Sequence, residues 1–401
     1  MIKPYRSAFN QHFTQAKYDA FLNDINQQFN YTPAFRIAET PIFIPQQLKE
    51  RLLEACEEIL AVVNHPDFKE LTHEAIKHPT LKVPSEDYTS RFIQLDFGIC
   101  LDENGDPIPK LIELQGFPSL YFYQDFLTEM YIKHFDIPDR FSVHLNGMKR
   151  TEYLEMLRHE IVGDTDPHQV VLLEVEPEHQ ATRIDFLCAE QMLGIKVLCI
   201  SKMKKRGKEL FYVEDNGEEV KILKIYNRVI FDELDKRTDL HREFYFKDEV
   251  DVEWVGHPNW FFRISKYTMP LLSGKYVPKS FYLDKMEEYP QNLGEYVLKP
   301  LYSFAGSGVQ LNVTKDMLDA IDDKENFILQ EKVKYHPIIE TPDGAARCEI
   351  RMMTLYNTRE HKTQVVTNLM RLTKGEMVGV KYNKDKDWVG GSAGFFENED
   401  R

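Results

Sequence analysis

A lysine-ended strand followed by a glycine-rich loop constrains this chain more than any other segment. An apolar run from Tyr296 ends at Lys299, and glycines at positions 306 and 308 follow in a loop of small residues. A second strand is expected over 310–313. Small residues let backbone N–H groups approach an anion, and the lysine supplies the countercharge. The segment therefore predicts a phosphate-binding loop, whereas the alternative is an ordinary tight turn of a hairpin.

A second apolar strand, expected over 327–333, becomes polar at Gln330 and Glu331. A strand of this kind can offer backbone groups to the edge of an adenine base and a carboxylate to the sugar. Together, residues 299–309 and 329–333 resemble the nucleotide site of the ATP-grasp ligases. This resemblance implies that ATP is held between a lysine-bearing strand, a glycine-rich flap and a hinge strand.

Residues 90–115 alternate apolar and polar side chains, which predicts two strands joined by a polar turn. If the turn is centred in its Asn-Gly pair, Asp96 lies directly opposite Glu113, and Gln115 shares their face of the sheet. Two opposing carboxylates repel each other, and a hard divalent cation between them removes the repulsion. The alternative is a pair of solvated carboxylates on an exposed sheet face.

The early position of this hairpin resembles the order found in circularly permuted ATP-grasp proteins, including the glutathionylspermidine-synthase-like group. That resemblance implies Mg²⁺ or Mn²⁺ bound by Asp96, Glu113 and Gln115. The sequence departs from the family pattern at two positions, because Gln115 stands for the usual asparagine and Gln94 for an arginine. The arginines that could supply the missing positive charge are Arg91, Arg351 and Arg371.

Two later strands also carry charged residues at a spacing of two. Glu349 and Arg351 share one face of a strand expected over 348–353, and Asn368 or Arg371 lies on the next strand. A solvated sheet face is the alternative to a binding site. The resemblance places these side chains near the ribose and phosphates, and implies that Arg351 or Arg371 steadies a developing oxyanion. The residues that the resemblance assigns to the nucleotide are Lys266, Lys299, Ser303, Gly306, Ser307, Gly308, Gln330, Glu331, Val333 and Glu349.

The expected fold class is α+β, an ATP-grasp body in permuted order with an inserted β-α-β domain of the pre-ATP-grasp kind. Strands at 169–175 and 194–200 flank a helical pattern, and a β-α-β unit requires a parallel sheet. The glycine-rich run 388–394 is expected to be a loop lining the cleft. The expected parts are a helical segment (1–85), the hairpin part of the body (86–160), the β-α-β domain (161–262) and the ATP-binding half (263–401).

Composition excludes several classes of protein. A chain of 401 residues with 42% hydrophobic content can bury enough core for two or three domains without disulfides. A net charge of −15 argues against a nucleic-acid surface. Five scattered cysteines indicate reduced thiols and a cytoplasmic location. No apolar run approaches the length of a membrane span, so no membrane partner is expected.

The function expected from the resemblance is an ATP-dependent carboxylate–amine ligase. A substrate carboxylate would attack the γ-phosphate, and an amine would displace phosphate from the resulting acylphosphate to form an amide. Such chemistry needs positioning and charge neutralisation rather than a side-chain nucleophile. The partners would be a small-molecule or peptide carboxylate and an amine; the sequence names neither these substrates nor an oligomeric state. Two alternatives stay open, a kinase on the same fold and a catalytically silent nucleotide-binding scaffold.

Overall fold

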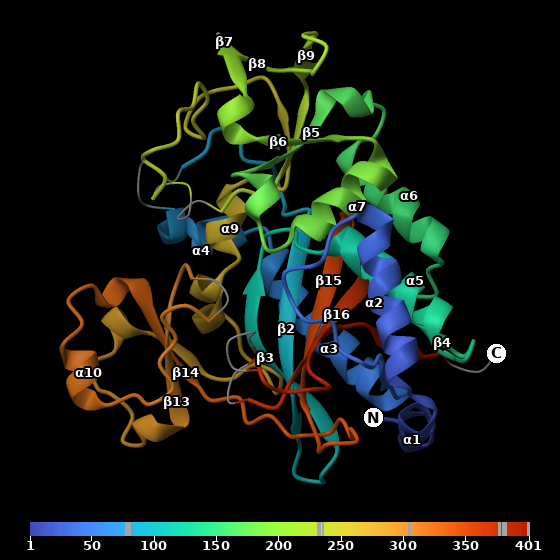
Figure 1. Cartoon of the computed structure of the whole chain (residues 1–401). Coiled ribbons are helices and arrows are strands. Elements are labelled where there is room, and N and C mark those ends of the chain that lie inside the picture. The colour runs from blue at the N-terminus through green and yellow to red at the C-terminus, as the bar shows by residue number, and fades with distance from the viewer. Residues whose placement is uncertain are drawn as a thin grey trace.

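The structure is a computed structural model in which a central antiparallel sheet carries a small lobe on one side and a parallel sheet at one end (Figure 1). The small lobe contains β13 and β14, and the parallel sheet contains β5 and β6. The described residues are 1–76, 82–230, 234, 236–303, 306–375, 378 and 383–398. No helix in these ranges is long and apolar enough to cross a bilayer. The five cysteines are all free thiols.

The central sheet has five strands in the order β17-β16-β15-β2-β3, all antiparallel to their neighbours. The strands are β2 (Phe92–Leu101), β3 (Pro107–Gln115), β15 (Arg347–Asn357), β16 (Lys362–Thr373) and β17 (Gly390–Ser392). The hairpin expected within 90–115 is present as β2 and β3. Its turn closes with a hydrogen bond from the Gly105 amide to the Asp102 carbonyl (3.0 Å), with Gly105 at a φ of +83°.

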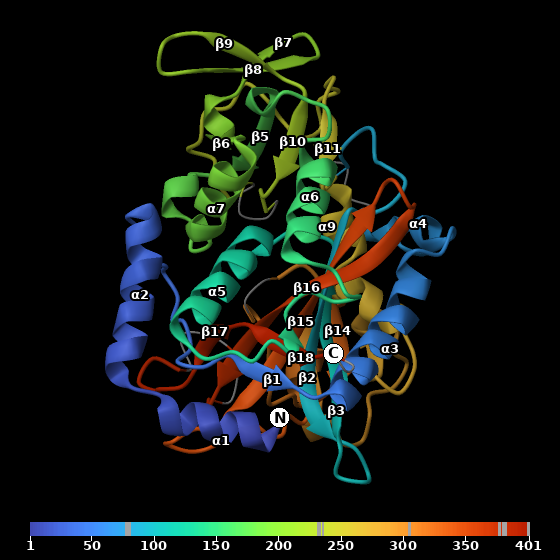
Figure 2. The ribbon, with the colours of Figure 1, turned by 90° about the vertical axis from the view of Figure 1, so that its right-hand side faces the viewer.

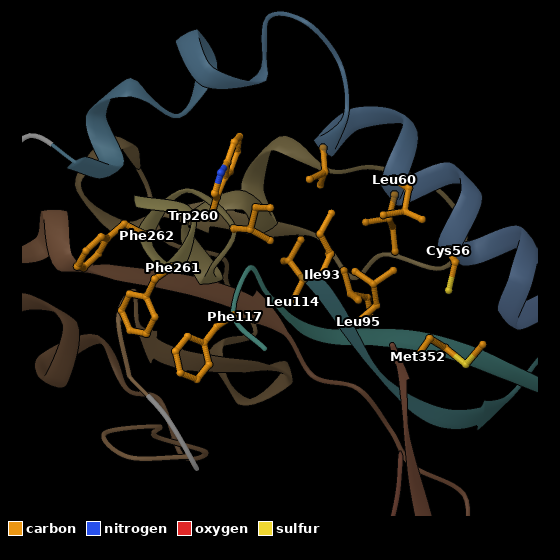
Figure 3. Close-up of a cluster of buried hydrophobic side chains, with 14 of the residues drawn as sticks. Cys56, Leu60, Ile93, Leu95, Leu114, Phe117, Trp260, Phe261, Phe262 and Met352 are labelled. Carbon is orange, nitrogen blue, oxygen red and sulfur yellow. The ribbon is translucent and has the colours of Figure 1, made fainter. Parts of the chain in front are cut away.

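One face of this sheet is apolar and packs against α3 (Gln46–Val63). The buried residues of α3 recur at intervals of three and four, which places them in one stripe along the helix. Figure 3 shows this stripe meeting side chains from β2, β3 and β15. The labelled residues of this contact are Cys56, Leu60, Ile93, Leu95, Leu114 and Met352. Because successive side chains of a strand point to opposite faces, the polar residues of the same strands lie on the other face.

A β-bulge in β3 sets which residues of the hairpin share that polar face. The pairs nearest the turn run regularly to Phe97 opposite Leu111, and this register alone would place Asp96 opposite Ile112. Ile112 is instead an extra residue without a partner on β2, so Asp96 pairs with Glu113. The predicted pairing of the two carboxylates is therefore present. The bulge produces it, because without the bulge Glu113 would point toward α3.

The small lobe is built on a three-stranded antiparallel sheet in the order β12-β14-β13. Its elements are β12 (Ser280–Tyr282), β13 (Tyr296–Pro300), β14 (Phe327–Glu331) and α10 (Lys315–Asp319). The prediction of a strand over 310–313 is wrong, since of these residues only Gln310 pairs with another strand, in an isolated bridge with Leu298. The chain turns away there because Thr314 caps α10 by accepting a hydrogen bond from the Met317 amide.

The parallel sheet has the order β11-β10-β5-β6, and β5 and β6 are joined through α7 as the sequence predicts. Its elements are β5 (Val170–Glu174), α7 (Arg183–Leu193), β6 (Lys196–Cys199), β10 (Lys224–Asn227) and β11 (Glu253–Val255). A small antiparallel sheet extends from it, comprising β7 (Lys204–Arg206), β8 (Glu209–Val213) and β9 (Glu219–Ile222).

The remaining helices cover the body on the side seen in Figure 2 and at the base of the parallel sheet. They are α1 (Lys3–His12), α2 (Gln15–Phe29), α4 (Phe68–Leu71), α5 (Tyr121–His134), α6 (Arg150–Ile161) and α9 (Asn259–Arg263). Helix α2 packs against α5, and α5 packs against α7. The aromatic helix expected after position 116 is thus present as α5.

A further sheet of three strands, in the order β1-β18-β4, contains both parallel and antiparallel pairs and corrects two expectations. Strand β1 (Ile42–Ile44) pairs in parallel with β18 (Gly394–Glu397), and β4 (Phe141–Ser142) pairs with the other edge of β18 (Figure 2). The segment expected to be helical throughout therefore contains a strand. The glycine-rich run at 388–394 is also not a loop lining a cleft. It forms β17 and the start of β18, where Gly390, at a φ of +119°, lets the backbone approach the Arg36 carbonyl.

Candidate functional site

Two lysines from the later half of the chain reach the β2–β3 hairpin. Lys299, at the end of β13, donates a hydrogen bond from Nζ to the carbonyl of Ile112 (2.8 Å). That carbonyl belongs to the bulged residue of β3. Lys266 begins the 3-10 helix Lys266–Leu271, and its Nζ lies 3.1 Å from Oε2 of Glu113 and 2.6 Å from the carbonyl of Ser303. Both lysines are only 6% exposed. The hairpin and the lysine-bearing strand are therefore in contact, as the sequence predicts.

Asp96 lies at the centre of an ion-pair cluster on the polar face of the sheet. It is 1% exposed and stands opposite Arg351 of β15. Nε and a terminal nitrogen of Arg351 donate to its two carboxylate oxygens, each at 2.6 Å. A terminal nitrogen of Arg371 donates to the same carboxylate at 2.7 Å. Of the three arginines predicted to replace the missing charge, these two reach Asp96. Arg91 instead binds the Glu160 carbonyl and Glu253.

Glu349 completes the cluster from β15. It stands opposite Arg371 and forms an ion pair with it. The hydroxyl of Tyr335 donates to its second oxygen at 3.2 Å. Tyr335 lies on the segment that joins the small lobe to the body, and its ring occupies the space that a Cβ at Gly98 would enter. The glycine therefore lets this ring cover the charged face. Asn368, the other candidate on β16, lies on the opposite face and binds the backbone of Gly394.

Electrostatics in this site favour an anion. Burial lowers the pKa of Lys299 to about 8, since the attraction of Glu113 offsets only part of the desolvation. Burial would raise the pKa of Glu113, but the neighbouring lysines and arginines outweigh it and lower that pKa to about 2. Among the described residues, Lys299 forms no ion pair with a carboxylate, and its ammonium donates a hydrogen bond to the neutral carbonyl of Ile112. A buried ammonium held in this way suits an incoming phosphate or carboxylate.

The predicted nucleotide residues are distributed over both faces of the small-lobe sheet. Gln330 stands opposite Val297, which places it on the same face as Lys299. Its Nε2 is buried and has no hydrogen-bond partner within the described ranges, so a donor there is available to a ligand. Glu331 lies on the other face, where its carboxylate accepts from the Lys279 amide at 3.1 Å. Val333 instead follows β14 and packs beside Gly98.

The glycine-rich loop directly follows β13, the strand that carries Lys299. Gly306 and Gly308 have φ values of +72° and +73°, which glycine adopts without strain. A Cβ at Gly308 would also lie 2.7 Å from the Pro300 ring. Ser307 is exposed, whereas Ser303 contributes its carbonyl to Lys266. Phe304 and Ala305, in the middle of the predicted loop, lie outside the described residues.

A small cavity marks the junction of the loop, the hairpin and Lys266. Its volume is about 20 Å³, and it is lined by residues that include Glu113, Gln115, Lys266 and Ser303. A space of this size holds about one water molecule. The space between Lys266 and the hairpin is therefore too small for a nucleotide in this structure.

A solved structure similar to this chain is that of a glutathione synthetase-like effector, GSS30, from Globodera pallida in its apo form. The two structures superpose with a TM-score of 0.56 over 97% of this chain and 98% of that chain, at 11% sequence identity. The chain has a glutathione-synthetase-like fold. No protein-family model and no curated protein matches the sequence.

The donors on the hairpin of this glutathione-synthetase-like fold do not suit a divalent metal as they are arranged. The carboxylate of Asp96 is bound by two guanidinium groups, and Glu113 is paired with Lys266. Gln115 donates its amide to Gln94. Within the described part of the chain, no group of three His, Cys, Asp or Glu side chains is placed to hold a metal ion. The two buried lysines, in contrast, carry charges that suit an anion.

The glutathione-synthetase-like fold also contains an arginine that sequence reasoning did not single out. Arg228 directly follows β10, at the carboxyl ends of the parallel strands, where ligands of open α/β sheets bind. Its guanidinium is buried between the rings of Phe117 and Phe186, at 5.0 and 5.3 Å from their centroids. Nε and one terminal nitrogen have no hydrogen-bond partner in the described ranges. Its signal in the sequence is an arginine at the end of an apolar strand.

Proposed function

We propose that this chain is an ATP-dependent carboxylate–amine ligase that forms an amide through an acylphosphate and releases ADP and phosphate. The observation that carries the proposal is the meeting of Lys299 and Lys266 with the β2–β3 hairpin. These segments are distant in sequence, and their order resembles that of the permuted ATP-grasp proteins. The glutathione-synthetase-like fold supports the same proposal.

The two lysines and the two arginines of the site have separate roles in this proposal. ATP supplies the phosphoryl group, and Lys266 and Lys299 bind its phosphates beneath the glycine-rich loop. The free donor of Gln330 and the backbone of β14 bind the adenosine end. Arg351 and Arg371 face the position where negative charge develops on the attacked carboxylate, and neutralise it. No nucleophilic side chain is needed, because the substrate carboxylate attacks directly.

The acid substrate enters from the side of the parallel sheet in this proposal. Arg228 offers a carboxylate there the N–H groups of Nε and Nη1, two nitrogens that have no hydrogen-bond partner in the described ranges. Its guanidinium makes a cation–π contact with Phe117, which lies two residues beyond Gln115. Arg228 is therefore next to the hairpin. A carboxylic acid or peptide with a second carboxylate therefore fits, with one acid group at Arg228 and the other near Arg351 and Arg371.

The proposal is tested by an ADP-release screen with pooled amino acids, polyamines and short peptides, followed by mass spectrometry of the products. An amide product whose formation at limiting ATP falls in Lys299→Ala supports the ligase. A phosphorylated product without an amide would identify a kinase instead. Nucleotide binding without turnover across the screen would favour a silent binding protein.

Replacing Lys299 with alanine is expected to weaken ATP binding about tenfold to hundredfold, which is the loss of one charge-assisted contact of about 1.5–3 kcal/mol. Isothermal titration calorimetry measures the change. Lys315→Ala is the matched control in the same lobe, because its side chain is exposed and pairs only with nearby Asp319. Equal affinities of the Lys299 variant and the wild type would contradict the proposed phosphate site.

ATP affinity is also expected to fall as pH rises above about 8. Lys299 has a lowered pKa of about 8, so it is charged at neutral pH and loses its proton in the alkaline range. Phosphate favours the charged form, and binding should therefore take up a proton above pH 7 and weaken by up to tenfold per pH unit above pH 8. Titrations in buffers of different ionisation enthalpy measure the uptake. Lys299→Arg should bind with little pH dependence, and a persistent dependence in that variant would assign it to another group.

A catalytically silent anion-binding protein is the second candidate function, and one observation favours it. The guanidinium groups of Arg351 and Arg371 already bind the carboxylate that the ligase family devotes to magnesium. The substitutions at Gln94 and Gln115 fall on the same network.

A further inference from the structure

The polar face of the central sheet carries two arginines on the strands beyond the hairpin. They are Arg351 on β15 and Arg371 on β16. Arg351 binds both oxygens of Asp96 at 2.6 Å, and Arg371 adds a third contact at 2.7 Å. A guanidinium group does not give up its proton in a protein. A divalent cation bound to Asp96 would therefore either displace these groups or lie beside two fixed positive charges. Like charges juxtaposed in a buried site repel strongly.

The two glutamines that depart from the family pattern fit this arrangement. Oε1 of Gln94 accepts a hydrogen bond from Arg351 at 3.0 Å and another from the side-chain amide of Gln115. Nε2 of Gln94 donates to the carbonyl of Ser119 at 2.7 Å, which fixes the orientation of the amide. An arginine at position 94 would face the guanidinium of Arg351 and repel it. The positive charge missing at position 94 is thus present on the neighbouring strand, and Gln115 acts as a donor within the network.

The formal charges of the cluster add up to a net positive charge, which can bind an anion that carries no metal ion. Its acidic members are Asp96, Glu113 and Glu349, and its basic members are Lys266, Lys299, Arg351 and Arg371. Three negative and four positive charges sum to one net positive charge. A polyphosphate that enters this cluster finds countercharge without bringing a metal ion.

We infer that this site binds the phosphate groups of its nucleotide without a divalent metal, with Arg351 and Arg371 standing in the place of the magnesium ions. The inference rests on the proposed nucleotide site and specifies its ligand as metal-free ATP or a related polyphosphate. It separates this chain from proteins in which the same hairpin binds Mg²⁺.

The direct test compares ATP binding by the wild-type protein in excess EDTA and in excess MgCl₂, measured by calorimetry. We expect the two dissociation constants to agree within about threefold. A loss of about tenfold or more in EDTA would overturn the inference. In parallel, electron paramagnetic resonance of added Mn²⁺ should detect no ion bound to the protein alone.

The variant Asp96→Asn separates the two arrangements by the direction of the effect. If Asp96 binds a metal, its loss should weaken ATP binding in MgCl₂. If Asp96 only neutralises the arginines, the variant gains one net positive charge, and ATP binding in EDTA should stay equal or strengthen. Asp106→Asn, in the exposed turn of the same hairpin, is the matched control and should change neither. Thermal unfolding of each variant confirms that it is folded at the temperature used.

Failure of the inference differs from failure of the proposed function. Binding of ATP only with Mg²⁺ would overturn the inference and leave the nucleotide site in place. If ATP binds under neither condition, the proposed nucleotide site fails, and the Mn²⁺ titration decides the metal question alone. Bound Mn²⁺ that is lost in Asp96→Asn would then overturn the inference, whereas no bound Mn²⁺ would support an arginine-neutralised cluster.

Discussion

Replacing Asp96 with alanine is expected to lower the free energy of unfolding by about 3–5 kcal/mol. The reason is that Arg351 and Arg371 would lose the carboxylate that neutralises them. Arg351 is buried and Arg371 is half-buried, and without Asp96 their charges lose a bidentate and a single charge-assisted contact. Guanidinium groups cannot discharge by losing a proton, so the desolvation cost would remain. Urea denaturation followed by circular dichroism measures the change.

The matched control for this variant is Asp106→Ala on the same hairpin. The side chain of Asp106 is 47% exposed and lies 4.0 Å from Arg51, which has a closer partner in Asp102 at 2.8 Å. Its removal should cost less than about 1 kcal/mol. Similar losses in the two variants would mean that the Asp96 cluster stabilises the fold no more than a surface ion pair does.

Replacing Leu95, the neighbour of Asp96 on β2, with alanine is expected to lower the free energy of unfolding by about 2–5 kcal/mol. It is fully buried on the opposite face of the strand, where it packs in the core that includes Met352 and the stripe of α3. The truncated side chain would leave a cavity. Because both faces of β2 are buried, the strand cannot move to fill that cavity. Urea denaturation again provides the measurement.

Leu101→Ala is the control for this second variant, since Leu101 ends the same strand and is 39% exposed. Its replacement should change the free energy of unfolding by about 0.5 kcal/mol or less. A comparable loss at both leucines would argue that the apolar face of β2 is not a close-packed core.

Alternation in the sequence was sufficient to predict the hairpin and the face that Asp96 and Glu113 share. The prediction relied on a regular ladder, whereas the observed ladder contains an extra residue at Ile112. In the sequence this bulge appears only as two adjacent apolar residues, Leu111 and Ile112, which do not by themselves distinguish a bulge from a fully buried stretch of strand. The site therefore gained a feature that sequence alone did not indicate, namely the Ile112 carbonyl that receives Lys299.

Long-range pairing marks the limit of the sequence prediction. The spacing of Glu349 and Arg351 predicted a shared face, but no local signal says that β15 lies next to β2. For that reason Arg91 remained a candidate beside Arg351 and Arg371. The strand β1 was missed for the same reason, since three residues become a strand only through their partner β18. The two Arg228 nitrogens that have no hydrogen-bond partner in the described ranges are likewise a property of the assembled core.

The position of β2 in the central sheet has a consequence for how this protein is made. One edge of β2 is completed by the adjacent β3, but the other edge pairs with β15, and Asp96 and Arg351 are 255 residues apart. During synthesis, a ribosome must therefore add most of the chain while a long, apolar strand edge remains bare. Such an edge can pair with other chains, and sheets that depend on distant partners form slowly. We expect the nascent protein to depend on chaperones until β15 and β16 have emerged.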